Sequence, residues 1–280
     1  MLTQIEGIHH ITSMARDAQE TDRFITGTLG LRRVKKTVNF DAPDVYHLYY
    51  ANGVGAPGTV MTYFPFPNIV AGSRGAGEVG TTVYAVPEGS LDYWTKRFDE
   101  HNVTGVARET RFGETRLRFD GIDGDGFALV ETKDDARAPW DGAGIDADVA
   151  IRGFHSASLV LRDNGGSKAL LSLMGYTPVA EDGGVLRMKR EAGNGADLID
   201  LETSPDAPVA RQGAGSVHHI AFAVADDPAE LAVRAALEAE GFRVTPVIDR
   251  DYFHSIYFAS SAPSCRSWRP APVWCRRVAM

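Results

Sequence analysis

The stretch SVHHIAFAV, Ser216–Val224, repeats a segment near the start of the chain, GIHHITSMA, Gly7–Ala15. Each segment is short, apolar and built around a His-His pair, a pattern that is typical of a β-strand. Neighbouring side chains of a strand point to opposite faces of the sheet. We therefore expect one histidine of each pair to face a shared interior.

The neighbours of each histidine indicate which one faces that interior. In the second copy, His219 shares its face with Ala221 and Ala223, and small side chains suit a cavity. The same register selects His10 in the first copy, with Thr12 beside it. Two imidazoles that reach one interior from distant strands are most simply explained as metal ligands. The alternative is two core or surface histidines that repeat by chance.

Composition limits the classes of protein to consider. The 280 residues are 44% hydrophobic, enough for two domains of ordinary size. No apolar run approaches the roughly 18 residues of a membrane-spanning helix, and Met1 opens onto a polar strand without a signal-peptide pattern, so we expect a cytoplasmic protein. The net charge of −8 argues against nucleic-acid and membrane partners. Cys265 and Cys275 are the only cysteines, so any metal must be held by His and carboxylate.

The chain repeats one cycle four times: a short apolar strand, a helix, then strands separated by turn residues. The first strands begin near residues 8, 81, 154 and 217, a spacing of 73, 73 and 63 residues that is too regular for chance. The spacing predicts an α+β fold of four βαβββ modules in two domains, and the family resemblance described below implies that these domains are half-barrels. The expected boundaries are 1–135 (modules about 1–75 and 76–135), a linker at 136–150, 151–258 (modules about 151–210 and 211–258), and a tail at 259–280.

This repeat resembles the vicinal oxygen chelate superfamily, which includes glyoxalases, bleomycin-resistance proteins and extradiol dioxygenases. Within it, the chain is similar to the PcpA-like branch of hydroquinone ring-cleaving dioxygenases. The similarity covers Met1–Phe258 and lies in four motifs: GIHHITSMARDAQETDRFITGTLGLRRVKKTVNFD, YHLYYAN, GAPGTVMTYFPFP and DRDYFHSIYF. In that family two βαβββ units close into a cup that holds Fe(II) by two histidines and one glutamate.

The resemblance implies roles for individual residues. The histidine ligands correspond to His10 and His219, in agreement with the strand register. Two residues would be catalytic, Tyr257 and His218. Three would contact the substrate: Arg250, Thr12 and His9. Arg250 would pair with a substrate oxyanion, and Tyr257 would hydrogen-bond the reacting oxygen or move a proton. The alternatives are a surface ion pair of Arg250 with Asp249 or Asp251, and a packing role for Tyr257.

Other histidines and glutamates have expected roles outside the site. His155 occupies the doublet position of the third module, where Phe154 replaces a second histidine, and this indicates a structural role. We expect His47 to be a partly exposed strand residue, and His101 to end a helix, where its charge suits the carboxyl end of the dipole. Two glutamates, Glu131 and Glu202, lie at the end of their own modules, at the position that corresponds to the glutamate ligand of the family.

The tail departs from the family after Phe258. There the family continues with a strand of the form R-x-P-G-G-V-L-F-E, whose glutamate is the third ligand. Counting forward places this glutamate at position 267, where the present chain has Ser267 instead. The tail also contains Pro270 and Pro272, which disfavour a replacement strand. We therefore expect an incomplete last module and a weakened metal site.

The resemblance implies a nonhaem Fe(II) dioxygenase, with Mn(II) or another divalent metal as a substitute, of the extradiol type. It would insert O2 into a hydroquinone or catechol ring and cleave it, in aromatic degradation or quinone detoxification. Two alternatives stay open: a glyoxalase-like isomerase or lyase that uses no O2, and a non-catalytic protein that binds a small aromatic compound. The exposed edges of the repeats favour a homodimer. For His10 and His219 to share an ion within about 4 Å, the first and fourth modules must form one cup.

The tail composition generates a testable hypothesis. Residues 259–280 contain four Arg, both Cys and two of the four Trp, but no Gly, Asp, Glu or Lys. Such a composition is what a GC-rich coding sequence gives when it is read out of frame, and the rival account is a genuinely diverged tail. We expect resequencing of the codons from Tyr257 to Arg277 to show a neighbouring frame that encodes a Gly-Gly-apolar-Glu strand. If no neighbouring frame does so, the frameshift hypothesis is wrong.

Overall fold

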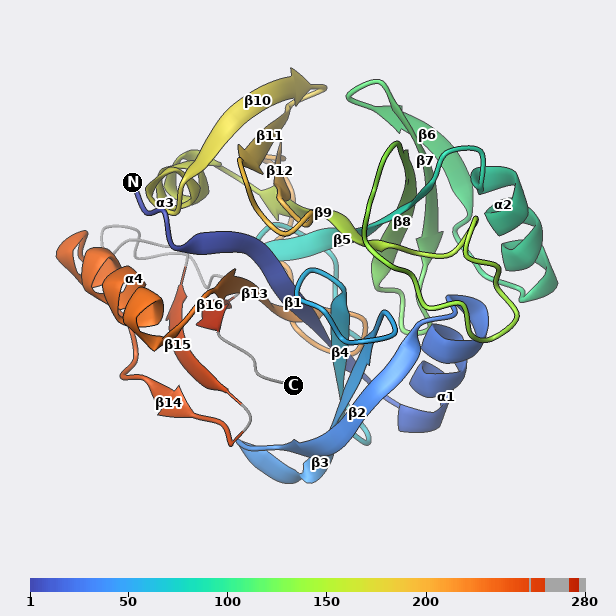
Figure 1. The fold of residues 1–280 in the computed structure, drawn as a ribbon, viewed down its shortest axis with the longest axis horizontal. Coiled ribbons are helices and arrows are strands. Elements are labelled where there is room, and N and C mark those ends of the chain that lie inside the picture. Colours follow the sequence, from blue (N-terminus) through green and yellow to red (C-terminus); the bar gives the residue numbers. More distant parts are fainter. Residues whose placement is uncertain (252, 260–271, 277–280) are drawn as a thin grey trace.

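The computed structural model describes residues 1–251, 253–259 and 272–276, the last of these as backbone only. In this part of the chain the strands form two curled sheets of eight (Figure 1). The first sheet has the order β14-β15-β16-β13-β1-β4-β3-β2. Its strands are β1 (Ile5–Ala15), β2 (Arg32–Asn39), β3 (Ala42–Ala51), β4 (Val60–Pro65), β13 (Val217–Val224), β14 (Ile248–Asp249), β15 (His254–Ala259) and β16 (Pro272–Arg276).

The second sheet has the order β10-β11-β12-β9-β5-β8-β7-β6. Its strands are β5 (Glu78–Pro87), β6 (Ala107–Arg111), β7 (Glu114–Asp120), β8 (Gly126–Thr132), β9 (Gly153–Leu161), β10 (Tyr176–Asp182), β11 (Val185–Arg190) and β12 (Leu198–Thr203). The described helices are α1 (Ala18–Asp22), the π-helix η1 (Arg23–Thr28), α2 (Leu91–Glu100), α3 (Gly165–Leu173) and α4 (Asp227–Ala239). None of them is long and apolar enough to cross a bilayer.

The strand pairing joins modules that are distant in the sequence. In each module the first strand pairs in parallel with the last strand: β1 with β4, β5 with β8, β9 with β12, and β13 with β16. Antiparallel pairing of β1 with β13 then joins the first and fourth modules, and pairing of β5 with β9 joins the second and third. The two halves of the sequence are therefore not the two sheets. The described residues 133–152, between β8 and β9, form neither a helix nor a strand.

The last module contains all its strands, contrary to the expectation from the tail prolines. The backbone of β16 lies between β13 and β15 and pairs with both. Pro272 is the first residue of β16, a position at which a strand tolerates proline because the missing N–H interrupts little of the ladder. Pro270 and Ser267 lie outside the described residues.

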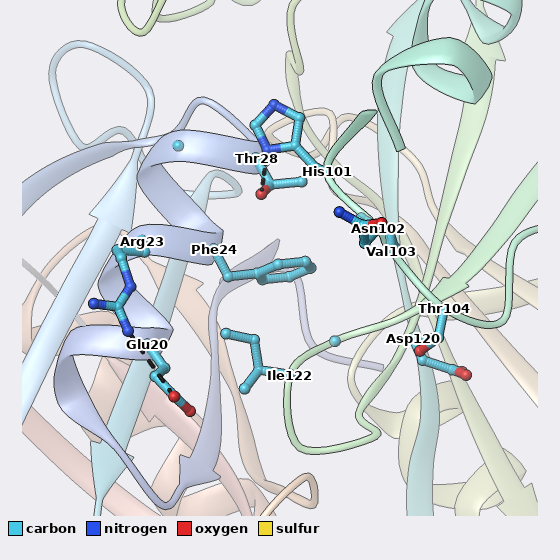
Figure 2. A pocket seen from close by; sticks show the side chains of 12 residues that line it. Glu20, Arg23, Phe24, Thr28, His101, Asn102, Val103, Thr104, Asp120 and Ile122 are labelled. Carbon is cyan, nitrogen blue, oxygen red and sulfur yellow. Dashed lines mark hydrogen bonds and ion pairs between the residues drawn. The ribbon is translucent and has the colours of Figure 1, made fainter. Parts of the chain in front are cut away.

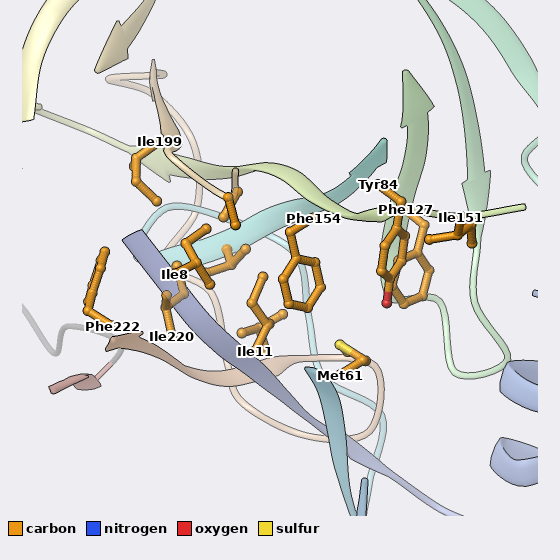
Figure 3. Close-up of a cluster of buried hydrophobic side chains, with 14 of the residues drawn as sticks. Ile8, Ile11, Met61, Tyr84, Phe127, Ile151, Phe154, Ile199, Ile220 and Phe222 are labelled. Carbon is orange, nitrogen blue, oxygen red and sulfur yellow. The ribbon is translucent and has the colours of Figure 1, made fainter. Parts of the chain in front are cut away.

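One face of each sheet packs into a shared core. Ile8 and Ile11 of β1 are fully buried in the same core as Phe154 of β9, whose ring stacks on Tyr84 of β5 (Figure 3). Burial of each such side chain contributes about 1.5–3 kcal/mol. Because Ile11 alternates with His10 and Thr12 along β1, the same pattern that builds the core directs these two polar side chains to the other, concave face.

The concave face of the second sheet is filled by charged groups. Arg187 donates two hydrogen bonds to the carboxylate of Asp200, at 2.8 and 3.0 Å, and a third to Glu114 at 2.7 Å. Burial alone would raise the pKa of Glu114, but the hydrogen bonds and charges of His155 and Arg187 hold it at about 2. His155 thus lies in this second cup, 3.4 Å from Glu114, and not beside the paired histidines.

The buried ion pair of the second cup yields a stability prediction. Asp200 is fully buried, so Asp200→Asn should weaken the two charged hydrogen bonds with Arg187, leave Glu114 as the acidic partner of Arg187, and lower the free energy of unfolding by about 1.5–3 kcal/mol. Urea denaturation measures this change. Glu191→Gln is the control, because Glu191 pairs with Lys189 on the surface and should change stability by less than about 0.5 kcal/mol. A loss below about 1 kcal/mol for Asp200→Asn would contradict the prediction.

Candidate functional site

His10 and His219 meet on the concave face of the first sheet. Their Nε2 atoms are 3.1 Å apart although 209 residues separate them in the sequence. Each side chain is 1% exposed, and the two rings are nearly perpendicular. The antiparallel ladder brings them together, because it places His219 opposite Thr12 and His10 opposite Ala221. The separation lies within the 4 Å expected for two residues that share an ion.

The other histidine of each doublet lies beside its neighbour. His9 Nδ1 is 3.0 Å from His10 Nδ1, and His218 Nδ1 is 2.8 Å from His219 Nδ1. The expectation that these residues point to the opposite face was therefore wrong. The β1–β13 ladder skips His9 on one strand and His218 on the other. Such bulges locally break the alternation of side chains and redirect them, often next to active sites.

The arrangement of the four rings fits the binding of one metal ion. Two nitrogen ligands that are each about 2.1 Å from a metal lie about 3 Å apart when they occupy adjacent positions. The Nδ1 atoms of His10 and His219 both contact a neighbouring histidine, and such a contact orients a metal-binding imidazole and fixes its tautomer. Burial lowers the pKa of His218 and so favours its neutral form.

A third protein ligand is not present in the described part of the chain. There, no group of three or more His, Cys, Asp or Glu residues is placed to hold a metal ion. Glu131 accepts a hydrogen bond from the backbone N–H of Leu91, and Glu202 pairs with Arg111, both in the second sheet. Ser267, where the family ligand was expected, lies outside the described residues.

Two threonines continue the polar surface from the imidazole pair. Thr12 Oγ1 is 2.8 Å from His219 Nε2 and 2.6 Å from Thr62 Oγ1. Both threonines are fully buried. Threonine side chains are small, so the concave surface beside His219 is polar and carries no bulky group at these two positions.

Arg250 and Tyr257 lie together on one wall of the cup. Arg250 Nε donates to the Tyr257 hydroxyl at 2.7 Å, and its two terminal nitrogens donate to the Asp41 carboxylate at 3.0 and 3.2 Å. The expected alternative partners, Asp249 and Asp251, are not the ones that Arg250 uses. Asp41 belongs to the β2–β3 hairpin, so this ion pair links the two edges of the first sheet, where Figure 1 shows β14 beside that hairpin.

The opposite wall holds a pair that sequence reasoning missed. His47 was expected to be partly exposed, but it is 6% exposed, and its Nδ1 is 2.8 Å from the Tyr49 hydroxyl. The ring of Phe64 lies 4.4 Å from the His47 ring and 6.5 Å from the His219 ring, measured between centroids. The alternation in YHLYY could have shown that His47 and Tyr49 share one face of β3.

A cavity of about 540 Å³ lies elsewhere, between η1 and the segment that joins α2 to β6 (Figure 2). Phe24 and Ile122 contribute its apolar surface. His101, which ends α2 as expected, contacts the Thr28 hydroxyl at 3.1 Å. None of the described site residues named above lines this cavity, so it is separate from the imidazole pair.

Comparison with known proteins gives a consistent group of relatives. No protein-family model matches the chain. The chain is 41% identical over 259 residues to the putative ring-cleaving dioxygenase MhqO of Bacillus subtilis, covering 92% of this chain and 82% of MhqO. It is 37% identical over 266 residues to the chlorohydroquinone/hydroquinone 1,2-dioxygenase of Sphingobium indicum, covering 91% and 82%.

Solved structures agree with this grouping. A crystal structure of a putative dioxygenase from Bacillus subtilis matches with a TM-score of 0.89 and 38% identity, covering 98% of this chain and 85% of that one. Glyoxalase I from Zea mays matches with a TM-score of 0.68 and 12% identity, covering 96% and 92%. The second likeness shows a shared fold alone.

The paired doublets generate a prediction about metal binding. His9→Ala and His218→Ala should each lower the affinity for a divalent metal by about 10–100-fold, because each removes the contact that orients a ligand. Calorimetric titration of the metal-free full chain with Co(II) measures this change. His101→Ala, remote from the doublets, should bind Co(II) like the unchanged protein. Equal affinity of all three variants would contradict the assignment.

Proposed function

The chain belongs to the ring-cleaving dioxygenases of the vicinal oxygen chelate superfamily, and from this premise we propose that it binds Fe(II) through His10 and His219 and cleaves a dihydroxylated aromatic ring with O2. The proposed reaction is of the extradiol type, with a hydroquinone or a catechol as substrate. One observation carries the proposal: two buried imidazole Nε2 atoms 3.1 Å apart, the separation of adjacent ligands on one ion.

Bound iron would lower the pKa of a ligated phenol and allow its electrons to reach O2. The residues of the chain would position the reactants. His9 and His218 hold the two ligand rings through their Nδ1 contacts. Thr12 and Thr62 would face a substrate ring with small polar side chains, and the ring of Phe64 would give the site beside His219 an apolar side.

Tyr257 lies on β15, at the side of the cup that also holds Arg250, and is the residue there that is best suited to transfer a proton. Its hydroxyl accepts a hydrogen bond from Arg250, and a phenol hydroxyl can both accept and donate hydrogen bonds, as a proton-transfer group must. Asp41 holds the Arg250 guanidinium by two hydrogen bonds and so fixes the direction of this contact. We therefore assign Tyr257 to proton transfer and Arg250 to its orientation.

The donor set also favours a second candidate function. The described residues supply two imidazoles and no third His, Cys, Asp or Glu ligand, and a site with a carboxylate fewer holds a divalent ion more weakly. A protein that binds a small aromatic compound in the cup without cleaving it is consistent with this observation. The two candidates differ in O2 consumption.

Oxygen uptake distinguishes them. After anaerobic addition of Fe(II), we expect the full chain to consume O2 with hydroquinone or catechol, and a chelator to abolish this uptake. His10→Ala and His219→Ala should each lower the rate at least about 100-fold, because each removes a ligand. Tyr46→Phe, on the outer face of β3, should retain the rate.

A version with the family tail, ending in a strand of the form R-x-P-G-G-V-L-F-E, should consume O2 faster than the natural chain, because it regains a charged ligand. Ligand binding without O2 uptake in both versions would support the binding protein instead.

A further inference from the structure

The loop 121–125, which joins β7 to β8 in the second sheet, docks on the first sheet through two carboxylates. Arg16, the residue after β1, donates its backbone N–H to Asp123 Oδ2 at 2.9 Å, and its side chain pairs with Asp123 Oδ1 at 3.1 Å. The hydroxyl of Tyr63, on β4, donates to Asp125 Oδ2 at 2.8 Å. The loop is therefore attached to the first sheet at the end of β1 and at β4.

The loop fits closely around these carboxylates. A Cβ added at Gly121 would clash with Asp125 Oδ1, and one added at Gly215, just before β13, would clash with the backbone carbonyl of Asp123. The backbone N–H of Gly121 donates to the backbone carbonyl of Asp125 at 2.8 Å. Asp125 is 4% exposed. Its carboxyl group is thus enclosed, and water can solvate it only if the loop moves.

The surroundings of Asp125 do not neutralise a negative charge. Arg74 is the cation near it, but Arg74 pairs with Glu78 at 3.4 Å. Within the described part of the chain, no Lys, Arg or His forms an ion pair with Asp125. The titratable and charged groups that act on it are Tyr63 from β4, Tyr84 from β5, Asp123 from its own loop and Arg74 from the segment before β5.

Asp125 is the group of this cluster that titrates. Burial raises the pKa of Asp125 to about 6, and the hydrogen bond from Tyr63 opposes this only in part. Burial and the charge of Asp125 raise the pKa of Tyr63 and of Tyr84, so both phenols stay protonated. The stability that the protonated carboxyl contributes is fully present below the ordinary pKa of aspartate, about 3.9. It is lost as the pH rises through about 6.

β4 connects this contact to the imidazole pair. Tyr63 points into the core, and its neighbour Thr62 points to the concave face, because side chains alternate along a strand. Thr62 Oγ1 is 2.6 Å from Thr12 Oγ1, which is 2.8 Å from His219 Nε2. A movement of β4 at Tyr63 therefore reaches His219 through two hydrogen bonds.

We propose that Asp125 is a pH-dependent link between the two sheets: its protonated form holds loop 121–125 against β4, and its ionised form loosens both. A protonated carboxyl can accept from Tyr63 and donate its own proton. The Tyr84 hydroxyl, buried without a hydrogen-bond partner among the described residues, is an acceptor for that proton. An ionised carboxyl keeps Tyr63 but places an uncompensated charge in the core.

This inference goes beyond the proposed function and holds whether or not the chain cleaves a ring, because it concerns the attachment of the second sheet to β4. The experiment below needs neither metal nor substrate. Failure of ring cleavage therefore leaves it unaffected.

Amide hydrogen exchange of the full chain tests the proposal. Asp125→Asn keeps an acceptor for Tyr63 and adds an NH2 donor, so it mimics the protonated carboxyl without its titration. Near pH 7.5 we expect residues 60–65 and 120–126 to exchange at least about 10-fold faster in the natural chain than in Asp125→Asn. Near pH 5 the two proteins should exchange alike. Each comparison is made at one pH, so the intrinsic exchange rate cancels.

Two further variants separate titration from simple packing. Asp99→Asn, on the exposed side of α2, should exchange like the natural chain at both pH values. Tyr63→Phe removes a hydrogen bond that lowers the pKa of Asp125. In urea denaturation, the pH at which Asp125→Asn becomes stabilising should therefore be higher in the Tyr63→Phe background than in the natural one.

Three results would overturn the link. One is faster exchange in Asp125→Asn than in the natural chain near pH 7.5, or failure of this variant to fold, since either shows that the carboxylate itself holds the loop. Another is a difference in exchange that is equal at both pH values. The third is an onset of stabilisation that Tyr63→Phe does not move.

Discussion

The antiparallel pairing of β1 with β13 is the contact on which the site depends. It joins the first module to the fourth and places His10 and His219 with their Nε2 atoms 3.1 Å apart. The same ladder carries a bulge on each strand, and these bulges place His9 and His218 against the Nδ1 atoms of the central rings. Without this pairing each doublet would be an ordinary pair of strand histidines.

The two sheets have the same strand order and have diverged in the chemistry of their concave faces. In the second sheet Arg187, Asp200 and Glu114 satisfy one another with three hydrogen bonds. In the first sheet the corresponding positions carry imidazole, threonine and tyrosine groups, which can both donate and accept hydrogen bonds. A site for substrate needs the second kind of surface, because groups already saturated by buried ion pairs have no bonding capacity left.

The repeat spacing and strand parity in the sequence were sufficient to predict the modular α+β fold and the meeting of His10 with His219. They failed where the backbone departs from regular alternation, as at the bulged His9 and His218. They also failed where a partner comes from another module, because nothing near Arg250 in the sequence points to Asp41. His47 was misjudged because its burial depends on Phe64 of the adjacent strand. The last strand was misjudged because the disfavoured proline stands at its first residue.

The joining of the first module to the fourth also affects how the chain folds during synthesis. The second and third modules are complete, and can pair with each other, before β13 has left the ribosome. β1 emerges about 200 residues earlier than its partner, which at roughly 5–20 residues per second is a delay on the order of 10–40 s. During this interval β1 has one unpaired edge and an apolar face, the kind of surface on which nascent chains aggregate or recruit chaperones. The doublet that forms half of the site is thus among the first segments made and among the last to reach its native pairing.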